Sequence, residues 1–313
     1  MSLFDKILQG KVNIGYLGYS MMAYGYRFIT GIKDSKRLRK QCYDSSDLEI
    51  QKNIRYMDDR SKYHLLDIYH PKRKSPFGTI MVIHGGGLMD GDKDLNRYSN
   101  MELCRRGYDV VAISYSLLPR SNFETQISEC LNALHFIMEN QERLHLNLSH
   151  FYLFGDSAGG LLSLQVAGIL KERKYHERFH LDNIDISIQA IGLVSSMSKL
   201  KREDNLSLPY QVAKIRKISD IELAEHLSDA TKWFDKHFPP CILSTSDGDM
   251  LKEDSIELCQ HFSQNKFRYE FNNYEANENR LNHVFLILYP LWEESQDFFN
   301  RVDHFFHQDS IGQ

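Results

Sequence analysis

The sequence predicts an α/β fold in which helices flank a mostly parallel central sheet. From about Tyr63 onward, short β-rich runs alternate with longer helical patterns, which is typical of repeated βαβ units. Two of the runs, residues 80–83 and 110–113, are continuously apolar, as expected of strands covered on both faces. Of the 313 residues, 42% are hydrophobic and 26% charged, so the composition is that of a globular protein and argues against extended disorder.

Seven strands and three helices follow from these patterns. The strands are expected at residues 64–69, 79–84, 109–115, 151–154, 187–194, 241–246 and 268–272. The helices are expected at residues 123–139, 157–170 and 290–307. In the first helix, Ile127, Leu131 and Leu134 recur at helical spacing and therefore share one face.

Two segments lie outside this alternation and predict the domain organisation. We expect residues 1–45 to form an N-terminal flap that contributes to a small helical cap. Residues 46–313 should form one domain, with a charged cap insertion at about 197–235. Within the insertion, residues 219–222 read Ser-Asp-Ile-Glu, a capping-box pattern that should begin a helix. The cap is where we expect the acyl and alcohol groups of a substrate to be selected.

A serine flanked by glycines is the candidate nucleophile. Gly155, Ser157 and Gly159 form G-x-S-x-G between an expected strand and an expected helix, which is the context of a nucleophile elbow. The tight turn strains the serine backbone, and only small neighbours let the strand and helix approach so closely. The helix N-terminus then directs its dipole toward the reacting group. An ordinary glycine-rich turn would match the same pattern.

A second motif, His84 followed by three glycines, ends an apolar strand 73 residues before the elbow motif. Consecutive glycines leave backbone N–H groups uncovered, as an oxyanion hole requires. A nucleotide-binding loop is disfavoured, because Asp92 occupies the position where a P-loop has its lysine.

Together, HGGG and GDSAGG resemble the hormone-sensitive-lipase-like branch of the α/β-hydrolases, which includes bacterial carboxylesterases and acetyl esterases. The resemblance covers about residues 63–307 and implies an α/β-hydrolase fold. It also implies that the N–H groups of Gly86, Gly87 and Ala158 form the oxyanion hole. The residue after HGGG is often aromatic in the family but is leucine here. We expect this Leu88, and Asp156 of the elbow, at the substrate-binding site.

The acid and the histidine of a triad should follow the serine in that order. Two aspartates follow the strand expected at 241–246, and the family pattern of Asp, one residue, then Leu favours Asp249 over Asp247. His283 fits the family's His-x-Phe pattern and lies after the last expected strand. The later histidines at 304 and 307, and the one at 261, lie in helical patterns. We therefore expect Ser157, Asp249 and His283 as the catalytic residues.

These residues predict a serine hydrolase that cleaves short-chain, acetyl-type carboxylic esters through an acyl-enzyme intermediate. The mechanism requires no metal and no organic cofactor. An amidase, a formamidase or a small peptidase could use the same triad, and a non-catalytic binding module could use the same fold. Residues 176–180 match the zinc motif H-E-x-x-H, but they follow a leucine-rich helix and look like its charged end.

The composition also limits partners and location. A net charge of −4 gives no reason to expect nucleic acid, so the expected partner is a small-molecule ester. Residues 12–26 carry no charged side chain. This segment is nevertheless too short and too rich in glycine and tyrosine for stable membrane insertion. Five scattered cysteines without a CxxC pair favour a reducing, cytoplasmic compartment. A signal peptide and surface attachment are the alternatives for residues 12–26, and a homodimer is left open.

Overall fold

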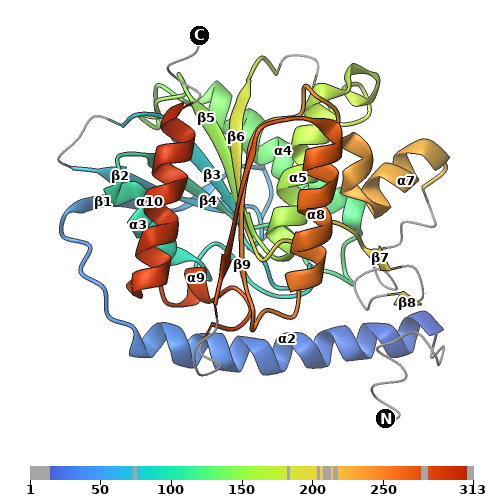
Figure 1. Ribbon diagram of the computed structural model, residues 1–313, viewed down its shortest axis with the longest axis horizontal. Coiled ribbons are helices and arrows are strands. Elements are labelled where there is room, and N and C mark those ends of the chain that lie inside the picture. The colour runs from blue at the N-terminus through green and yellow to red at the C-terminus, as the bar shows by residue number, and fades with distance from the viewer. Residues whose placement is uncertain are drawn as a thin grey trace.

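An eight-stranded sheet forms the centre of the computed structural model, which describes residues 15–72, 76–181, 184–202, 205, 206, 213, 218–275 and 281–308 (Figure 1). The strand order is β1-β2-β4-β3-β5-β6-β9-β10. The strands are β1 Leu48–Arg55, β2 Leu65–Pro71, β3 Thr79–Ile83, β4 Asp109–Ile113, β5 Phe151–Asp156, β6 Ile188–Val194, β9 Cys241–Ser246 and β10 Tyr269–Tyr274. β2 runs antiparallel to β1 and β4, and the other neighbouring pairs are parallel, which confirms the predicted fold class. A separate two-stranded ribbon pairs β7 Lys201–Arg202 with β8 Asn205–Leu206.

Helices cover both faces of the sheet. They are α2 Gly15–Lys40, α3 Arg97–Arg105, α4 Phe123–Glu139, α5 Ala158–Lys171, α7 Ile221–Ser228, α8 Lys252–Asn265, α9 Phe285–Leu288 and α10 Glu293–Gln308, with short 3-10 turns η1 Arg173–Tyr175 and η3 Ala230–Trp233. Alternate residues of each strand enter different cores. Met81 and Ile83 of β3 pack in the core with α4, α5 and α8, whereas Ile80 and Val82 pack with α3, α9 and α10.

Each of the seven predicted strands is present, with ends that move by up to two residues. The structure adds β1, an edge strand whose charged sequence and irregular burial gave no alternating signal. It also adds α3, and it gives bounds to α8, the helical pattern expected around the histidine at 261. The residues that α3 buries include Ser99, Asn100 and Glu102, so its sequence lacks an apolar stripe. The predicted helix in the insertion is α7, but its N-cap is Asp220, not Ser219, because the Asp220 carboxylate accepts a hydrogen bond from Leu223 N.

Within the described part of the expected N-terminal flap, residues 15–40 form one helix, α2, which runs beneath the carboxyl ends of the strands in Figure 1. Two hydrogen bonds of Arg27 hold the middle of α2 against the domain. Its Nε donates to Met89 O at 2.5 Å, and its Nη2 donates to Leu118 O at 2.6 Å. Of the segments assigned to the cap, residues 1–14, 203–204, 207–212 and 214–217 lie outside the described residues. None of the described helices combines the length and the apolarity that crossing a membrane requires.

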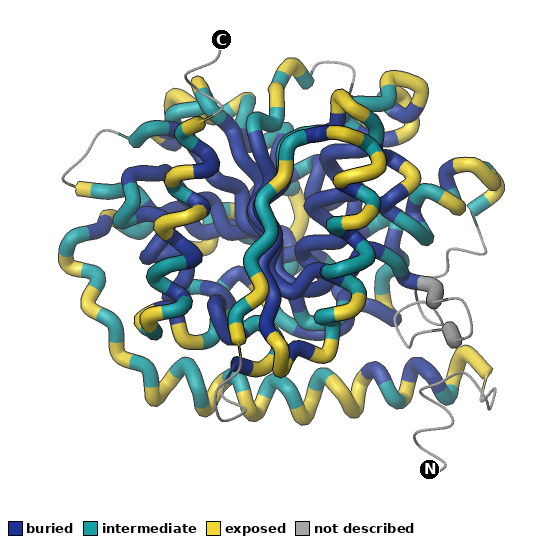
Figure 2. The backbone as a smooth tube through the Cα atoms, viewed as in Figure 1, coloured by how far each residue is buried: buried dark blue, intermediate teal, exposed yellow. Residues whose placement is uncertain are grey.

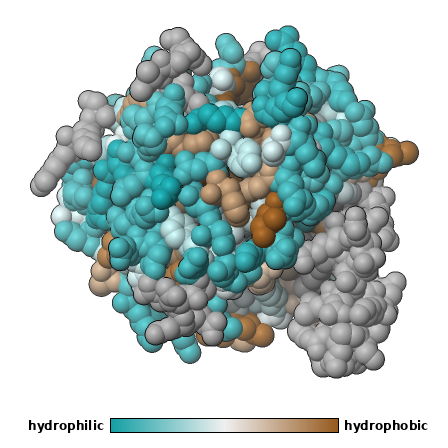
Figure 3. All heavy atoms as spheres, viewed as in Figure 1, coloured by the Kyte–Doolittle hydropathy of each residue, from teal (hydrophilic) through white to brown (hydrophobic). Residues whose placement is uncertain are grey.

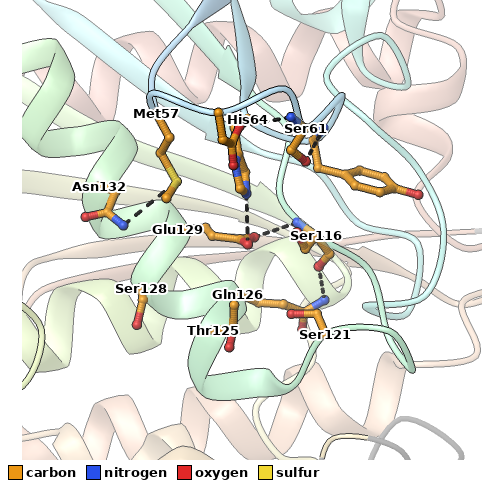
Figure 4. Close-up of polar contacts among 12 residues, drawn as sticks. Met57, Ser61, His64, Ser116, Ser121, Thr125, Gln126, Ser128, Glu129 and Asn132 are labelled. Atoms are coloured by element: carbon orange, nitrogen blue, oxygen red, sulfur yellow. Dashed lines mark hydrogen bonds and ion pairs between the residues drawn. The ribbon is translucent and has the colours of Figure 1, made fainter.

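A buried histidine joins the antiparallel edge of the sheet to α4 (Figure 4). His64 Nδ1 lies 2.6 Å from Asp59 Oδ2, and its Nε2 lies 2.9 Å from Glu129 Oε1. The second oxygen of Glu129 accepts a hydrogen bond from Ser116 N at 2.6 Å. One carboxylate therefore links the start of β2, helix α4 and the loop after β4.

Candidate active site

The elbow serine sits where β5 meets α5, in a strained backbone conformation. Ser157 has φ 51°, and its N–H donates to Val194 O on the neighbouring strand at 2.8 Å. A Cβ on Gly159 would lie 2.0 Å from Ile83 O, and one on Gly155 would lie 2.4 Å from Gly159 O. Neither contact is physically tolerable, so the close approach of strand, helix and β3 requires glycine at both positions.

The sheet register brings the glycine motif to the elbow. β3 runs parallel to β5 with Ile83 opposite Gly155, so the residues after β3 emerge beside the residues after β5. In the loop that follows, Gly86 has φ 104° and Gly87 has φ 62°, values that favour glycine. The loop after β3 therefore lies beside the N-terminus of α5, and both segments carry backbone N–H groups.

A hydrogen-bonded relay connects the serine to a buried carboxylate. His283 Nε2 lies 3.0 Å from Ser157 Oγ, and His283 Nδ1 lies 2.8 Å from Asp249 Oδ1. Asp249 is buried, and its Oδ1 also accepts a hydrogen bond from Leu251 N at 2.8 Å. A neutral imidazole with its proton on Nδ1 satisfies both contacts, because Nε2 can then accept the serine proton.

The loops that carry the acid and the histidine are joined to each other. Gly248 and Asn282 form an isolated parallel β-bridge, and the Ser246 hydroxyl donates to Leu281 O. These contacts hold the loop after β9 beside the loop after β10. The two residues of the relay, 34 positions apart in the chain, therefore have a fixed separation.

Asp247, the rival acid, faces elsewhere. Its Oδ1 accepts from Asn273 Nδ2 at 2.7 Å and pairs with Lys252 Nζ at 2.8 Å. These contacts lower its pKa below the usual aspartate range. The structure thus brings Asp249 to His283 and leaves Asp247 in an exposed surface network.

Two buried carboxyl groups differ in their electrostatics. Burial alone would raise the pKa of Asp249, but the hydrogen bond and attraction of His283 outweigh it and lower that pKa. The pKa of Asp156 is raised, because burial dominates the hydrogen bonds that Asn96 and Gly85 donate to it. Asp249 is therefore held as the anion that a triad requires.

Leu88 and Asp156, the two residues expected at the substrate-binding site, are both buried. Leu88 is completely buried in the core beside α4, and its carbonyl accepts hydrogen bonds from Leu118 N and Gln126 Nε2. Asp156 is buried behind the glycine loop, where it accepts hydrogen bonds from protein groups. Both side chains contact protein here, and their expected contact with substrate stays a prediction.

Two residues near the site gave no signal in the sequence. Ser195, after β6, has φ 49°, accepts a hydrogen bond from Val284 N at 3.3 Å and contributes to the lowered pKa of Asp249. Tyr26 on α2 lies next to the glycine loop, since a Cβ on Gly87 would be 3.8 Å from its hydroxyl. Only the tertiary structure reveals these neighbours, because one follows a strand without a motif and the other lies on a distant helix.

The H-E-x-x-H segment does not form the helix that a zinc peptidase site needs. Residues 176–180 are turns that follow η1, and His180 has φ 56°. His176 Nε2 lies 2.9 Å from Leu170 O, so that ring bonds the end of α5. The two histidines therefore do not share one helical face.

Known proteins resemble this chain in sequence and in structure. An acetyl esterase of Salmonella choleraesuis (strain SC-B67) is 28% identical over 220 residues, which span 66% of each chain. Esterase B from Lactobacillus rhamnosis, solved with a tributyrin phosphonate inhibitor, superimposes with a TM-score of 0.85 at 24% identity, covering 94% of this chain and 96% of that one. A bacterial heroin esterase superimposes with a TM-score of 0.68 at 17% identity, covering 95% and 94%.

The structural neighbours share the α/β-hydrolase fold of this chain. The BD-FAE family model matches residues 66–258, a stretch that contains the glycine motif, the elbow and the acid loop. This chain is an α/β-hydrolase of the esterase branch and belongs to the BD-FAE family.

Proposed function

We propose that this serine ester hydrolase cleaves short-chain, acetyl-type carboxylic esters through an acyl-enzyme intermediate. The observation that carries the proposal is the unbroken relay from Asp249 through His283 to Ser157, with contacts of 2.8 Å and 3.0 Å. Its three members come from loops after three different strands, so the relay depends on the whole fold. The acetyl preference is supported by the acetyl esterase relatives.

In the proposed reaction, His283 Nε2 takes the hydroxyl proton of Ser157 as Oγ attacks the ester carbonyl carbon. Asp249 keeps the imidazole in its reactive tautomer and stabilises the imidazolium that forms. Collapse of the tetrahedral intermediate transfers the proton to the departing alcohol and leaves an acyl-serine. Water, deprotonated by His283, then releases the acid and restores the serine.

The negative oxygen of the intermediate is proposed to accept hydrogen bonds from Gly86, Gly87 and Ala158 N–H. The positive φ angles of the two glycines and the place of Ala158 at the start of α5 support this assignment. Each such donor contributes about 3–4 kcal/mol to transition-state stabilisation in related chemistry.

The proposed cap comprises residues 1–45 and the insertion at about 197–235. The position of Tyr26 next to the glycine loop supports a role for α2 in shaping the acyl pocket. We also propose a cytoplasmic location, for which the five cysteines, all present as free thiols, are the supporting feature.

The deciding experiment compares purified wild type with Ser157→Ala on aryl acetate, aryl butyrate and longer aryl esters. We expect the variant to lose at least about 10⁴-fold in kcat, because the nucleophile is gone. Ser128→Ala on the outer helix α4 is the matched control and should retain wild-type turnover. Hydrolysis of acetyl esters by Ser157→Ala at the wild-type rate would overturn the mechanism. Formyl amides and acetylated sugars, assayed in parallel, determine whether esters are preferred over amides.

A further inference from the structure

Exposed apolar side chains are concentrated on α2. Of the thirteen large hydrophobic residues that are exposed in the described part of the chain, eight lie on this one helix. In Figure 2, α2 is yellow and teal along most of its length, whereas the helices against the sheet show long blue stretches. The face shown in Figure 3 is mostly hydrophilic, with hydrophobic residues in small separate patches. A whole helix with this exposure calls for an explanation.

The exposed residues form an ordered stripe on the outward side. Leu17, Met21, Tyr24, Phe28 and Ile32 recur every three or four positions, so they share the face opposite the buried residues at 19, 20 and 23. Leu17 is 76% exposed and Phe28 is 71% exposed. The inward side is already fastened to the domain through the two hydrogen bonds of the arginine at 27. The outward stripe is therefore available without unfolding the helix.

The last two turns of the same helix carry a cluster of exposed cations. Lys33, Lys36, Arg39 and Lys40 are exposed, and one acidic residue, Asp34, lies on the described helix. The Asp34 side chain is partly buried, and its Oδ1 lies 3.4 Å from Arg37 Nε. The chain as a whole carries a net charge of −4, so this local excess of positive charge is opposite in sign to the rest of the molecule.

Three more exposed apolar residues lie at the same end of the sheet, namely Met250, Tyr289 and Leu291. Met250 directly follows the relay aspartate at 249. α9, which precedes the other two, is joined to the segment after α2 by a hydrogen bond from Gln41 Nε2 to Leu288 O at 2.6 Å. Exposed apolar side chains therefore occur both on α2 and on loops near the relay.

We propose that the outward face of α2 docks the protein on an anionic lipid surface, with the helix lying in the plane of the interface. An apolar stripe that inserts among acyl chains, next to lysines and arginines that meet anionic headgroups, is the pattern of an interfacial helix. Charge complementarity favours anionic lipid over a second copy of this chain, because two such basic faces would repel each other. Docking would place α2 between the membrane and the glycine loop, which lies next to Tyr26 of this helix. It requires no catalytic step and stands apart from the proposed reaction.

Co-sedimentation of the full-length protein with vesicles tests the proposal. We expect binding to vesicles of phosphatidylglycerol and phosphatidylcholine in equal parts, and weaker binding to phosphatidylcholine alone. Leu17→Ser and Phe28→Ser should each lower the partition coefficient about tenfold, because each removes a large apolar side chain from the interface. The pair Lys36→Glu and Arg39→Glu should lower it on anionic vesicles but not on neutral ones, and added salt should have the same effect.

Two controls make the result specific to α2. Ile221→Ser removes a side chain that is 75% exposed on α7, and Lys236→Glu reverses an exposed charge away from α2. Both should bind vesicles like wild type, and Ser157→Ala should bind equally well if docking is independent of the chemistry.

Several outcomes would overturn the proposal. Absence of the wild type from the vesicle pellet is one, and equal losses in the α2 and control variants are another. Sedimentation velocity supplies a third: a dimer that Phe28→Ser dissociates, with no vesicle binding, would show that the face meets a second copy. Loss of ester hydrolysis in Ser157→Ala does not affect vesicle co-sedimentation or sedimentation velocity. Failure of docking and failure of the proposed function are therefore distinguishable.

Discussion

The Asp156 carboxylate accepts a hydrogen bond of 3.0 Å from the backbone N–H of Gly85, which ties the nucleophile strand to the glycine loop. The same oxygen accepts from Asn96 Nδ2 at 2.6 Å, and the whole contact is buried. Gly85 directly precedes the two glycines assigned to the oxyanion hole. Asp156 is therefore a positioning residue, which sets where those N–H groups stand relative to Ser157.

Asp156→Ala should weaken both the fold and the reaction. It leaves two buried donors without their acceptor, at about 1–3 kcal/mol each, so the free energy of unfolding should fall by about 2–6 kcal/mol. Turnover should fall at least about tenfold with a smaller change in KM, since the displaced loop supports the transition state. Denaturant unfolding and steady-state kinetics measure the two effects.

Asp156→Asn is the matched comparison, because its amide oxygen can still accept from both donors. It should recover most of the stability that Asp156→Ala loses. If the two variants were equally destabilised, the negative charge and not the hydrogen bonds would be what the loop requires.

The two aspartates after β9 should behave very differently when each is changed to alanine. Asp249→Ala removes the partner of His283 Nδ1, so kcat should fall by about 10⁴-fold. Asp247→Ala removes an exposed contact with Asn273 and Lys252 and should stay within about twofold of wild type. Steady-state kinetics on an aryl acetate decides it, and the opposite ranking would assign the acid to Asp247.

The elbow and the glycine loop could be predicted from sequence because backbone geometry fixes their residue types. A Cβ at Gly159 would lie 2.0 Å from Ile83 O, so no other residue fits at this position. The geometric requirement therefore appears in the sequence as a glycine. The parallel strands were equally readable, since strands such as β3 and β4 are apolar throughout.

The sequence could not predict the features that depend on which way a side chain points in the folded protein. Leu88 and Asp156 stand beside the two motifs, yet their side chains turn into the protein, and no local pattern reports which way a loop side chain points. α2 was expected only as a flap because its apolar residues occur on both sides of the helix. Tyr19 and Ala23 pack inward while Phe28 is exposed, so the apolar periodicity does not distinguish a buried face of the helix from an exposed one.

Glycine-to-alanine changes at the elbow and on α2 should have opposite effects. Gly159→Ala introduces a methyl group into backbone atoms of β3, which cannot move aside, so we expect loss of activity and a free energy of unfolding lower by several kcal/mol, of order 3. Gly25→Ala adds a methyl group with no atom within 4 Å and should stabilise the protein by about 0.5–1 kcal/mol. Thermal unfolding of both variants checks the signs. A stable, active Gly159→Ala enzyme would contradict the close approach.

The contacts of His64 predict a pH-dependent part of the stability. Burial opposes the charge on this ring, but the hydrogen bonds and attraction of Glu129 and Asp59 outweigh it and raise the pKa of His64 above 6.5. A raised pKa in the folded state contributes stability that is fully present below the unfolded value of about 6.5 and is lost as pH rises through the folded value. Glu129→Gln should therefore destabilise the protein most in mildly acidic solution, and the difference from wild type should shrink toward alkaline pH. Urea unfolding over this range measures it, with Glu139→Gln, on the same helix and paired with the half-exposed His135, as the control that should show little pH dependence. A difference between Glu129→Gln and wild type that stays constant across the range would show that protonation of His64 is not coupled to folding.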